Sequence, residues 1–191
     1  MLKFKLFKTT VFLSYPFCFA VTVLAVLDKT GFLFASLICV ILHETGHLAI
    51  MHFIKIRCVS ATLKIGTISI ITKEGISTKK RALIAVGGPL MNFMCVPLLS
   101  FGGFFEKLGA ASLAMCLFNL LPSAGLDGGD IAYFLFCRIT EKYAETMLKV
   151  SSLLCVVLII ILGAYLLCIT GGNSTMLLAG IYLIFFSFIK V

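Results

Sequence analysis

The distribution of apolar residues constrains this chain more than any other feature. Six apolar runs lie at residues 11–27, 31–54, 82–101, 108–126, 151–170 and 175–189. Each is close to the length of about 17 to 25 residues at which a helix crosses a bilayer. Hydrophobic residues make up 61% of the sequence and the mean hydropathy is +1.14, which excludes an ordinary soluble domain. We therefore expect an all-α polytopic membrane protein with about six transmembrane helices.

The basic residues lie between the apolar runs and indicate an orientation. They concentrate before the first run, between the second and third, and between the fourth and fifth. Because cytoplasmic segments carry an excess of Lys and Arg, both termini are predicted to be cytoplasmic. We assign the formal charge of +8 to this role, with the lipid bilayer and no nucleic acid as partner. The first run could be a cleaved signal peptide, but the short turn at residues 28–30 favours a retained helix.

The segment between the second and third runs has a different pattern. From Ile56 to Thr72, polar residues partly alternate with Leu and Ile. Such alternation, with many β-branched residues, is typical of a short β-hairpin, here turning near Gly66. An irregular cytoplasmic loop is the alternative.

The second run contains three ionisable residues within the sequence His43-Glu44-Thr45-Gly46-His47. A charge near the bilayer centre costs about 3 kcal/mol, so such residues usually face a partner or a water-filled cavity. Residues four apart share one face of a helix, so His43 and His47 are spaced to bind one zinc ion. Glu44 lies beside them and can act as general base on a water molecule that the metal activates. The alternative is that the motif occurs by chance, but this does not explain why a membrane span contains residues whose insertion is unfavourable in free energy.

The end of the fourth run predicts a break in the helix. Pro122 removes an amide donor, and the glycines that follow allow backbone conformations closed to other residues. Non-helical backbone at membrane depth is tolerated only where it is buried or lines a cavity. The second and fourth runs both end on the cytoplasmic side, so Asp127 is the natural third zinc ligand and leaves one position open. The alternative is a solvated aspartate after a helix end.

Three motifs in order carry a family resemblance. They are His43 to His47, Gly88-Pro89-Leu90-Met91-Asn92, and Asn119 to Gly129. Together they resemble the site-2 protease family of intramembrane zinc metalloproteases. The chain size is similar to that of its sporulation-type branch, which processes a membrane-associated transcription-factor precursor. The resemblance departs at Gly125, where many members have a second proline, and the length leaves no room for an appended regulatory domain.

The resemblance implies roles for seven residues. Zinc would be bound by His43, His47 and Asp127. Glu44 would be the catalytic acid and base, and Asn119 would hold the substrate or stabilise the oxyanion. Asn92 and Pro122 would help to shape the substrate-binding region. The resemblance also implies that the hairpin faces the membrane.

We expect one membrane-embedded domain over residues 1–191, with a catalytic core at about 31–129. The accessory helices would be residues 11–27, 151–170 and 175–189. The predicted function is a zinc metalloendopeptidase of the cell membrane that performs regulated intramembrane proteolysis. It would cut a peptide bond within or next to a transmembrane segment of a membrane-protein substrate and so release or activate a regulatory factor, with a membrane regulator as a second partner.

Two other functions are open at this stage. A membrane metal-ion transporter would need further polar residues along several spans, and the last two runs are nearly devoid of ionisable groups. A catalytically inactive membrane scaffold would be expected to lose motif residues, yet each chemical group is present.

Overall fold

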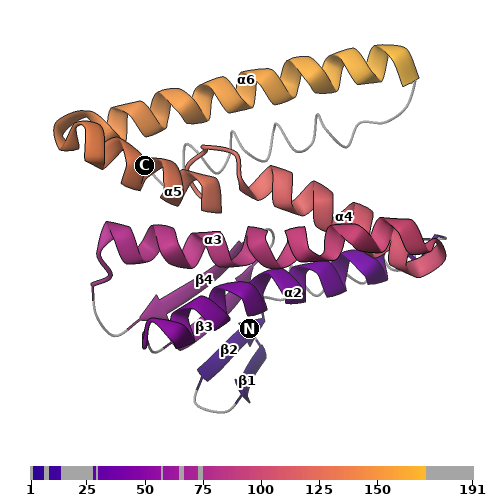
Figure 1. Ribbon diagram of the computed structural model, residues 1–191, viewed down its shortest axis with the longest axis horizontal. Coiled ribbons are helices and arrows are strands. Elements are labelled where there is room, and N and C mark those ends of the chain that lie inside the picture. The colour runs from indigo at the N-terminus through magenta and orange to yellow at the C-terminus, as the bar shows by residue number, and fades with distance from the viewer. Residues whose placement is uncertain are drawn as a thin grey trace. The chain divides into compact units, whose positions relative to one another are not determined.

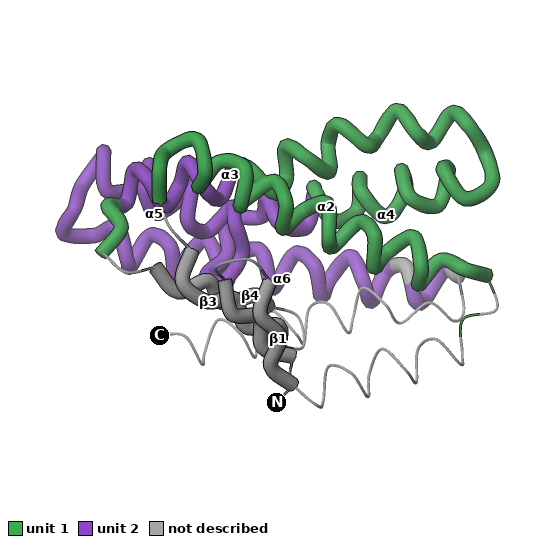
Figure 2. The backbone as a smooth tube through the Cα atoms, turned by 90° about the horizontal axis from the view of Figure 1, so that it is seen from below, with its two compact units in different colours: residues 1–77, 87–116 green, residues 78–86, 117–191 purple. Residues whose placement is uncertain are grey.

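The computed structural model describes residues 2–6, 9–13, 28, 30–56, 58–64, 67–72 and 75–170 (Figure 1). In chain order the elements are β1 (Leu2–Leu6), β2 (Thr9–Leu13), α2 (Phe32–Phe53), β3 (Cys58–Lys64), β4 (Thr67–Thr72), α3 (Thr78–Cys95), the 3-10 helix η1 (Val96–Phe101), α4 (Gly103–Asn119), α5 (Asp127–Ile139), the 3-10 helix η2 (Glu141–Tyr143) and α6 (Ala144–Thr170). They form two compact units. The first unit takes its described residues from 1–77 and 87–116, and the second from 78–86 and 117–191 (Figure 2).

The four strands form one sheet in the first unit, in the order β1-β2-β3-β4. Strands β1 and β2 pair antiparallel, β2 and β3 parallel, and β3 and β4 antiparallel. The β3–β4 register runs from Cys58 opposite Thr72 to Lys64 opposite Thr67, with an irregularity between Cys58 and Ser60. A parallel pair needs a long connection, and the chain between β2 and β3 includes α2.

The expected fold class, an all-α protein with about six transmembrane helices, is wrong. Its short hairpin is present as the antiparallel pair of β3 and β4, although the expected turn near Gly66 lies outside the described residues. Within the described ranges there are five α-helices and a four-stranded sheet. Three helical stretches there are long and apolar enough to cross a membrane, namely Phe32–Phe53, Thr78–Phe101 and Glu141–Ile169. The expected span at 108–126 is not among them, because α4 has 17 residues and ends at Asn119. Helix α4 also carries the charged residues Glu106 and Lys107 near its start.

The N-terminal strands explain part of this error. Leu2, Phe4 and Leu6 alternate with Lys3 and Lys5 in β1, which is the period-two pattern of a strand. The two lysines of β1 occupy every second position of a strand, whereas the sequence analysis assigned them to the basic flank of a helix. Residues 11–13 of the first expected span lie in β2. The rest of that span, its predicted retention or cleavage, and the expected helix at 175–189 lie outside the described residues.

The start of α2 is fixed by the carboxylate of Asp28. Its Oδ1 accepts hydrogen bonds from the Thr30 hydroxyl at 2.7 Å and the Thr30 amide at 2.9 Å, and its Oδ2 accepts one from the Leu33 amide at 2.7 Å. The first amides of a helix have no intrahelical partner, so these bonds favour helix formation here. They also lower the pKa of Asp28 from 3.8 to about 2, with the Thr30 hydroxyl as the largest cause.

Helices α2 and α4 pack through small side chains in the first unit. Their buried cluster comprises Ala35, Cys39, Leu108 and Ala111. Small residues let helix backbones approach closely, which is the usual basis of packing within a membrane. The Phe34 and Phe104 rings lie 5.7 Å apart, and Lys107 Nζ donates a hydrogen bond to the Thr30 carbonyl. These contacts hold the first half of α2, so that its second half, with the histidines, is set in a fixed position.

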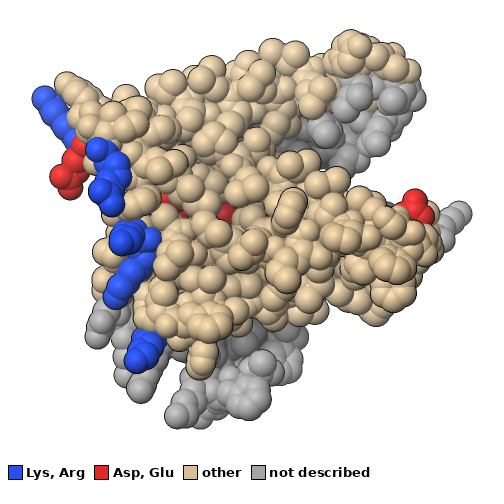
Figure 3. Space-filling model, in the orientation of Figure 1, with Lys and Arg blue, Asp and Glu red and all other residues tan. Residues whose placement is uncertain are grey.

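The described surface is strongly apolar. Large hydrophobic side chains are exposed on every long helix, including Phe53, Met94, Phe101, Ile139 and Tyr165. On the face drawn in Figure 3, charged side chains among the described residues are few. A soluble protein rarely exposes so much apolar surface, whereas the lipid tails of a bilayer accept it.

Candidate metal centre

Helices α2 and α3 cross at two glycines. A Cβ on Gly46 would meet the Gly87 carbonyl oxygen, and a Cβ on Gly87 would come within 2.5 Å of the Gly46 carbonyl oxygen. The two backbones are therefore in direct contact, and no side chain fits between them. Residues beside the crossing on each helix necessarily face one another.

Gly88 brings the α3 backbone against both histidines. A Cβ there would lie 2.5 Å from His43 Cε1, 2.5 Å from His47 Nε2 and 2.6 Å from His43 Nε2. Gly88 is thus one wall of the site, a role that the sequence analysis did not assign to it. The available signal was a pair of adjacent glycines inside a span, followed by a proline.

The two imidazoles are buried and lie at ligand spacing. His43 is 3% exposed and His47 is 7% exposed. Their Nε2 atoms are 3.1 Å apart, and the ring planes are nearly perpendicular, at 84°. Two nitrogen ligands of a tetrahedral zinc ion, each at about 2.0 to 2.1 Å, lie about 3.3 Å apart. The helix therefore places both nitrogens close to the separation that one zinc ion requires.

Glu44 completes a group of three metal-binding side chains. One ligand atom from each of His43, Glu44 and His47 lies within 4.8 Å of the other two. Glu44 is less buried than the two imidazoles. Two imidazoles with a nearby carboxylate are a donor set that suits zinc, so the residues fit the metal predicted from the sequence.

Asn92 lies behind His43. Its side-chain amide nitrogen is 3.0 Å from His43 Nδ1, and Asn92 is completely buried. A histidine that binds a metal through Nε2 carries its proton on Nδ1 and donates it to an acceptor. The nitrogen and oxygen of an amide exchange places by a half-turn, so Asn92 can accept that proton. This geometry gives Asn92 the role of orienting the His43 ring. The role of Asn92 in the substrate-binding region stays a prediction.

A second layer supports Asn92. The end of the Asn92 amide that faces away from His43 lies 3.7 Å from Cys39 Sγ, and the Ser112 hydroxyl donates a hydrogen bond to the same sulfur at 3.5 Å. Cys39 and Ser112 are almost fully buried. A chain of buried polar groups therefore runs from α4 through α2 and α3 to the imidazole of His43.

The other predicted site residues belong to the second unit. The expected helix break is confirmed, since α4 ends at Asn119, Pro122 lies in the turn that follows, and Asp127 is the first residue of α5. A carboxylate at the first turn of a helix is favoured by the partial positive charge there. The first unit brings together His43, Glu44, His47 and Asn92. The assignments of Asn119, Pro122 and Asp127 stay predictions.

Comparison with solved structures supports the family resemblance at the level of the fold. The structure described as "Site-2 Protease from Methanocaldococcus jannaschii" matches with a TM-score of 0.68, over 97% of this chain and 93% of that chain, at 19% sequence identity. This chain has the fold of that site-2 protease. No family model matches the sequence.

A curated relative agrees with this fold. The chain is 29% identical over 132 residues to "Putative zinc metalloprotease sll0528" of Synechocystis sp.. The match covers 62% of this chain but 34% of that protein, so the chain spans about a third of the length of its relative. The predicted sporulation-type branch is not confirmed by either comparison.

Proposed function

We propose that this protein is an intramembrane zinc metalloprotease of the site-2 type. It would hydrolyse a peptide bond within or next to a transmembrane segment of a membrane protein. The observation that carries the proposal is the pair of buried Nε2 atoms 3.1 Å apart, with the carboxylate of Glu44 beside them on an apolar helix. The shared fold and the name of the curated relative support it.

The proposal gives each residue of the site a separate task. His43, His47 and Asp127 would hold zinc, which when bound supplies the Lewis acidity that polarises a carbonyl and activates water. Glu44 takes a proton from the attacking water and delivers it to the leaving amine. Asn119 donates a hydrogen bond to the carbonyl oxygen as it gains charge, a contribution of about 100- to 1,000-fold in rate for such donors.

The substrate would be a membrane protein whose helix unwinds locally. In a helix each peptide carbonyl is hydrogen-bonded within the helix itself, so the scissile bond is hidden until that segment becomes extended. An extended segment can pair with the free edge of a sheet. Strands β1 and β4 are the outer strands of the sheet in the first unit and offer such edges.

The cellular setting follows from the same proposal. Three apolar helices support a place in the membrane. The proposal adds a multi-pass topology with both termini cytoplasmic, release or activation of a regulatory factor, and control by a membrane regulator.

Zinc content and proteolysis of purified variants test the proposal. The wild-type protein should bind one zinc ion and cleave a labelled unfolded polypeptide in detergent, a probe that removes the need to unwind a helix. Glu44→Gln should retain zinc and lose cleavage, because it removes the proton acceptor and keeps the size of the side chain. His47→Ala and Asp127→Ala should lose the metal. Cleavage that persists in Glu44→Gln would remove Glu44 from its assigned role.

Vesicles distinguish the protease from a transporter. Residues 150–170 of α6 contain no Asp, Glu, Lys, Arg or His, so this apolar helix offers no polar path for an ion. Protein reconstituted in sealed vesicles should therefore give no zinc flux above that of empty vesicles. Flux that disappears in His47→Ala would favour the transporter.

A further inference from the structure

We propose that Ser151 and Ser152, at the start of the apolar stretch of α6, are positioning residues for the proposed zinc site. They hold the loop of residues 120–126, which joins the predicted substrate ligand Asn119 to the predicted metal ligand Asp127. The inference rests on the proposed function and adds to it two residues that make no contact with metal or substrate.

The two hydroxyls bind the backbone of the loop at neighbouring points. Ser152 Oγ accepts a hydrogen bond from the Ala124 amide at 2.8 Å and donates one to the Leu148 carbonyl at 2.7 Å. Ser151 Oγ lies 2.8 Å from the Pro122 carbonyl and 3.0 Å from the Leu148 carbonyl, to either of which it can donate. Both loop positions lie between Asn119 and Asp127 in the sequence.

Within the described part of the chain, the hydrogen bonds that the loop makes inside itself span only two or three residues. Its backbone bonds are those of short turns, such as the Ser123 amide to the Leu121 carbonyl at 2.7 Å and the Leu126 amide to the Ser123 carbonyl at 3.1 Å. Gly125 has a φ of 91°, a conformation that favours glycine. The Ser123 hydroxyl is buried and has no hydrogen-bond partner within the described part of the chain. An unpaired buried hydroxyl is unfavourable, so external contacts must hold the loop in this form.

A shift of the loop would move Asp127. A Cβ on Gly128 would collide with the carbonyls of Leu120 and Leu121, and a Cβ on Gly129 would collide with the carbonyl of Ser123. The first turn of α5 thus lies directly against the loop, with no side chain between them to absorb a displacement. Any movement of residues 122–124 is passed to the start of α5, which is Asp127.

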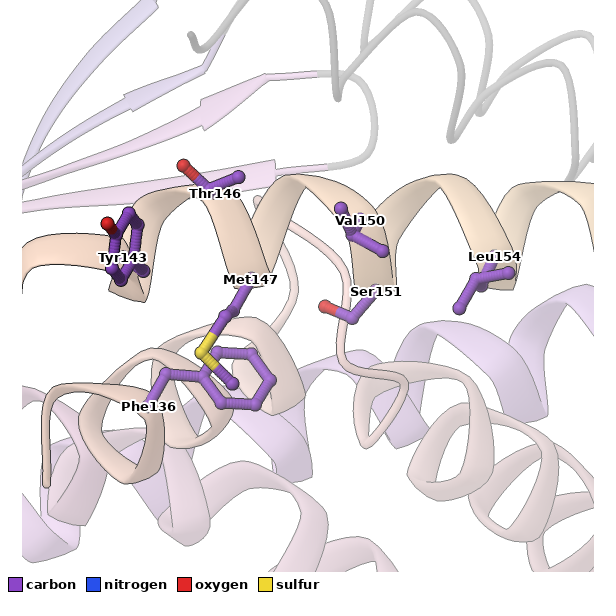
Figure 4. A pocket seen from close by; sticks show the side chains of 7 residues that line it. All are labelled: Phe136, Tyr143, Thr146, Met147, Val150, Ser151 and Leu154. Atoms are coloured by element: carbon purple, nitrogen blue, oxygen red, sulfur yellow. The ribbon is translucent and has the colours of Figure 1, made fainter. Parts of the chain in front are cut away.

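Ser151 also lines a cavity of about 410 Å³ between α5, η2 and α6. Figure 4 shows Phe136 and Met147 pointing toward one another, with Ser151 on the same side of α6 as Met147. Because Ser151 lines this cavity, we expect the methyl group of a threonine at this position to be accommodated there. Ser151→Thr should therefore keep the hydroxyl in place without a clash, and it serves as the conservative variant.

The experiment measures zinc affinity by chelator competition on this chain, residues 1–191, in detergent, with zinc alone as the probe. Ser151→Ala/Ser152→Ala should weaken zinc binding about tenfold or more, the usual effect of removing residues that orient metal ligands. Hydrogen exchange should become faster in the peptide that contains Ala124. Ser151→Thr should match the wild type in both measurements. Ser36→Ala is the matched control, because the Ser36 hydroxyl donates within its own helix, to the Phe32 carbonyl.

The outcomes separate this inference from the proposed function. Zinc affinity within about twofold of wild type in the double variant, or unchanged exchange at Ala124, overturns the positioning role while the protease proposal stands. Absence of zinc from the wild-type protein overturns both. If the double variant does not fold, Ser151→Ala and Ser152→Ala are measured separately against the same expected result.

Discussion

Gly88→Ala is the sharpest test of the metal centre, because the added atom is a single methyl carbon aimed at both histidines. That carbon would lie 2.5 Å from His43 Cε1 and from His47 Nε2, whereas ordinary contacts begin at 3.4 Å. The rings would have to retreat by 3.4 − 2.5, or about 0.9 Å. Helix α3 cannot move away in their place without opening the direct contact between Gly87 and Gly46.

A displacement of this size is several times the tolerance of a zinc site, in which ligand distances hold to about 0.2 Å. We expect Gly88→Ala to lower zinc affinity by at least about 100-fold, more than the loss of an orienting residue causes. Folding should suffer less, because alanine favours a helix interior over glycine by about 1 kcal/mol and offsets part of the strain. Chelator competition gives the affinity, and thermal unfolding of the metal-free protein gives the stability.

Two glycines of the first unit provide controls. A Cβ on Gly75 meets nothing within 4 Å, so Gly75→Ala should leave both measurements unchanged. A Cβ on Gly109 would lie 2.7 Å from the Leu99 amide nitrogen, so Gly109→Ala should lower the unfolding temperature through a clash between α4 and η1. Wild-type zinc affinity in Gly88→Ala would refute the assignment of the two Nε2 atoms as ligands.

Further predictions concern the groups that orient His43 and begin α2. Asn92→Leu should weaken zinc binding by about 10- to 100-fold, and Asn92→Asp should lose less because it keeps an acceptor for His43 Nδ1, as chelator competition would show. Asp28 has its pKa lowered from 3.8 to about 2, so its stabilising effect is present above about pH 3.8 and is lost as the pH falls through about 2. As the pH is lowered across that range, the unfolding temperature should fall more steeply in the wild type than in Asp28→Asn. Equal slopes of unfolding temperature against pH would contradict the role of this carboxylate.

The sequence predicted the local part of the site and missed the part that depends on tertiary contacts. The face shared by His43 and His47 follows from helix geometry alone, because residues four apart always lie together. The break after Asn119 was equally local, since proline and glycine act on their own backbone. The role of Gly88 depends on where α3 crosses α2, and no spacing within one helix reveals that crossing.

The sheet beyond the β3–β4 hairpin was missed for a similar reason. Parallel pairing of β2 with β3 joins segments separated by a whole helix, so neither strand identifies its partner in the sequence. The short alternation in residues 2–6 was too brief to outweigh the lysines as a basic flank. The long apolar helices α2, α3 and α6 and the local β3–β4 hairpin were predictable, whereas the pairing of β2 with the distant β3 was not.

In the first unit the zinc ligands share one seam with the helix packing, whereas Glu44 lies outside that seam. Cys39, His43 and His47 follow one another at four-residue intervals along α2, and Asn92 follows Gly88 at the same interval on α3, so one seam both packs the helices and orients the imidazoles. Any substitution in that seam changes stability and metal binding together. Glu44 lies off the seam and is less buried than the histidines, so Glu44→Gln should alter the reaction while leaving the helix packing and the zinc ligands in place. A loss of activity in that variant, at unchanged zinc affinity and unchanged unfolding temperature, therefore measures the proton-transfer role of Glu44 alone.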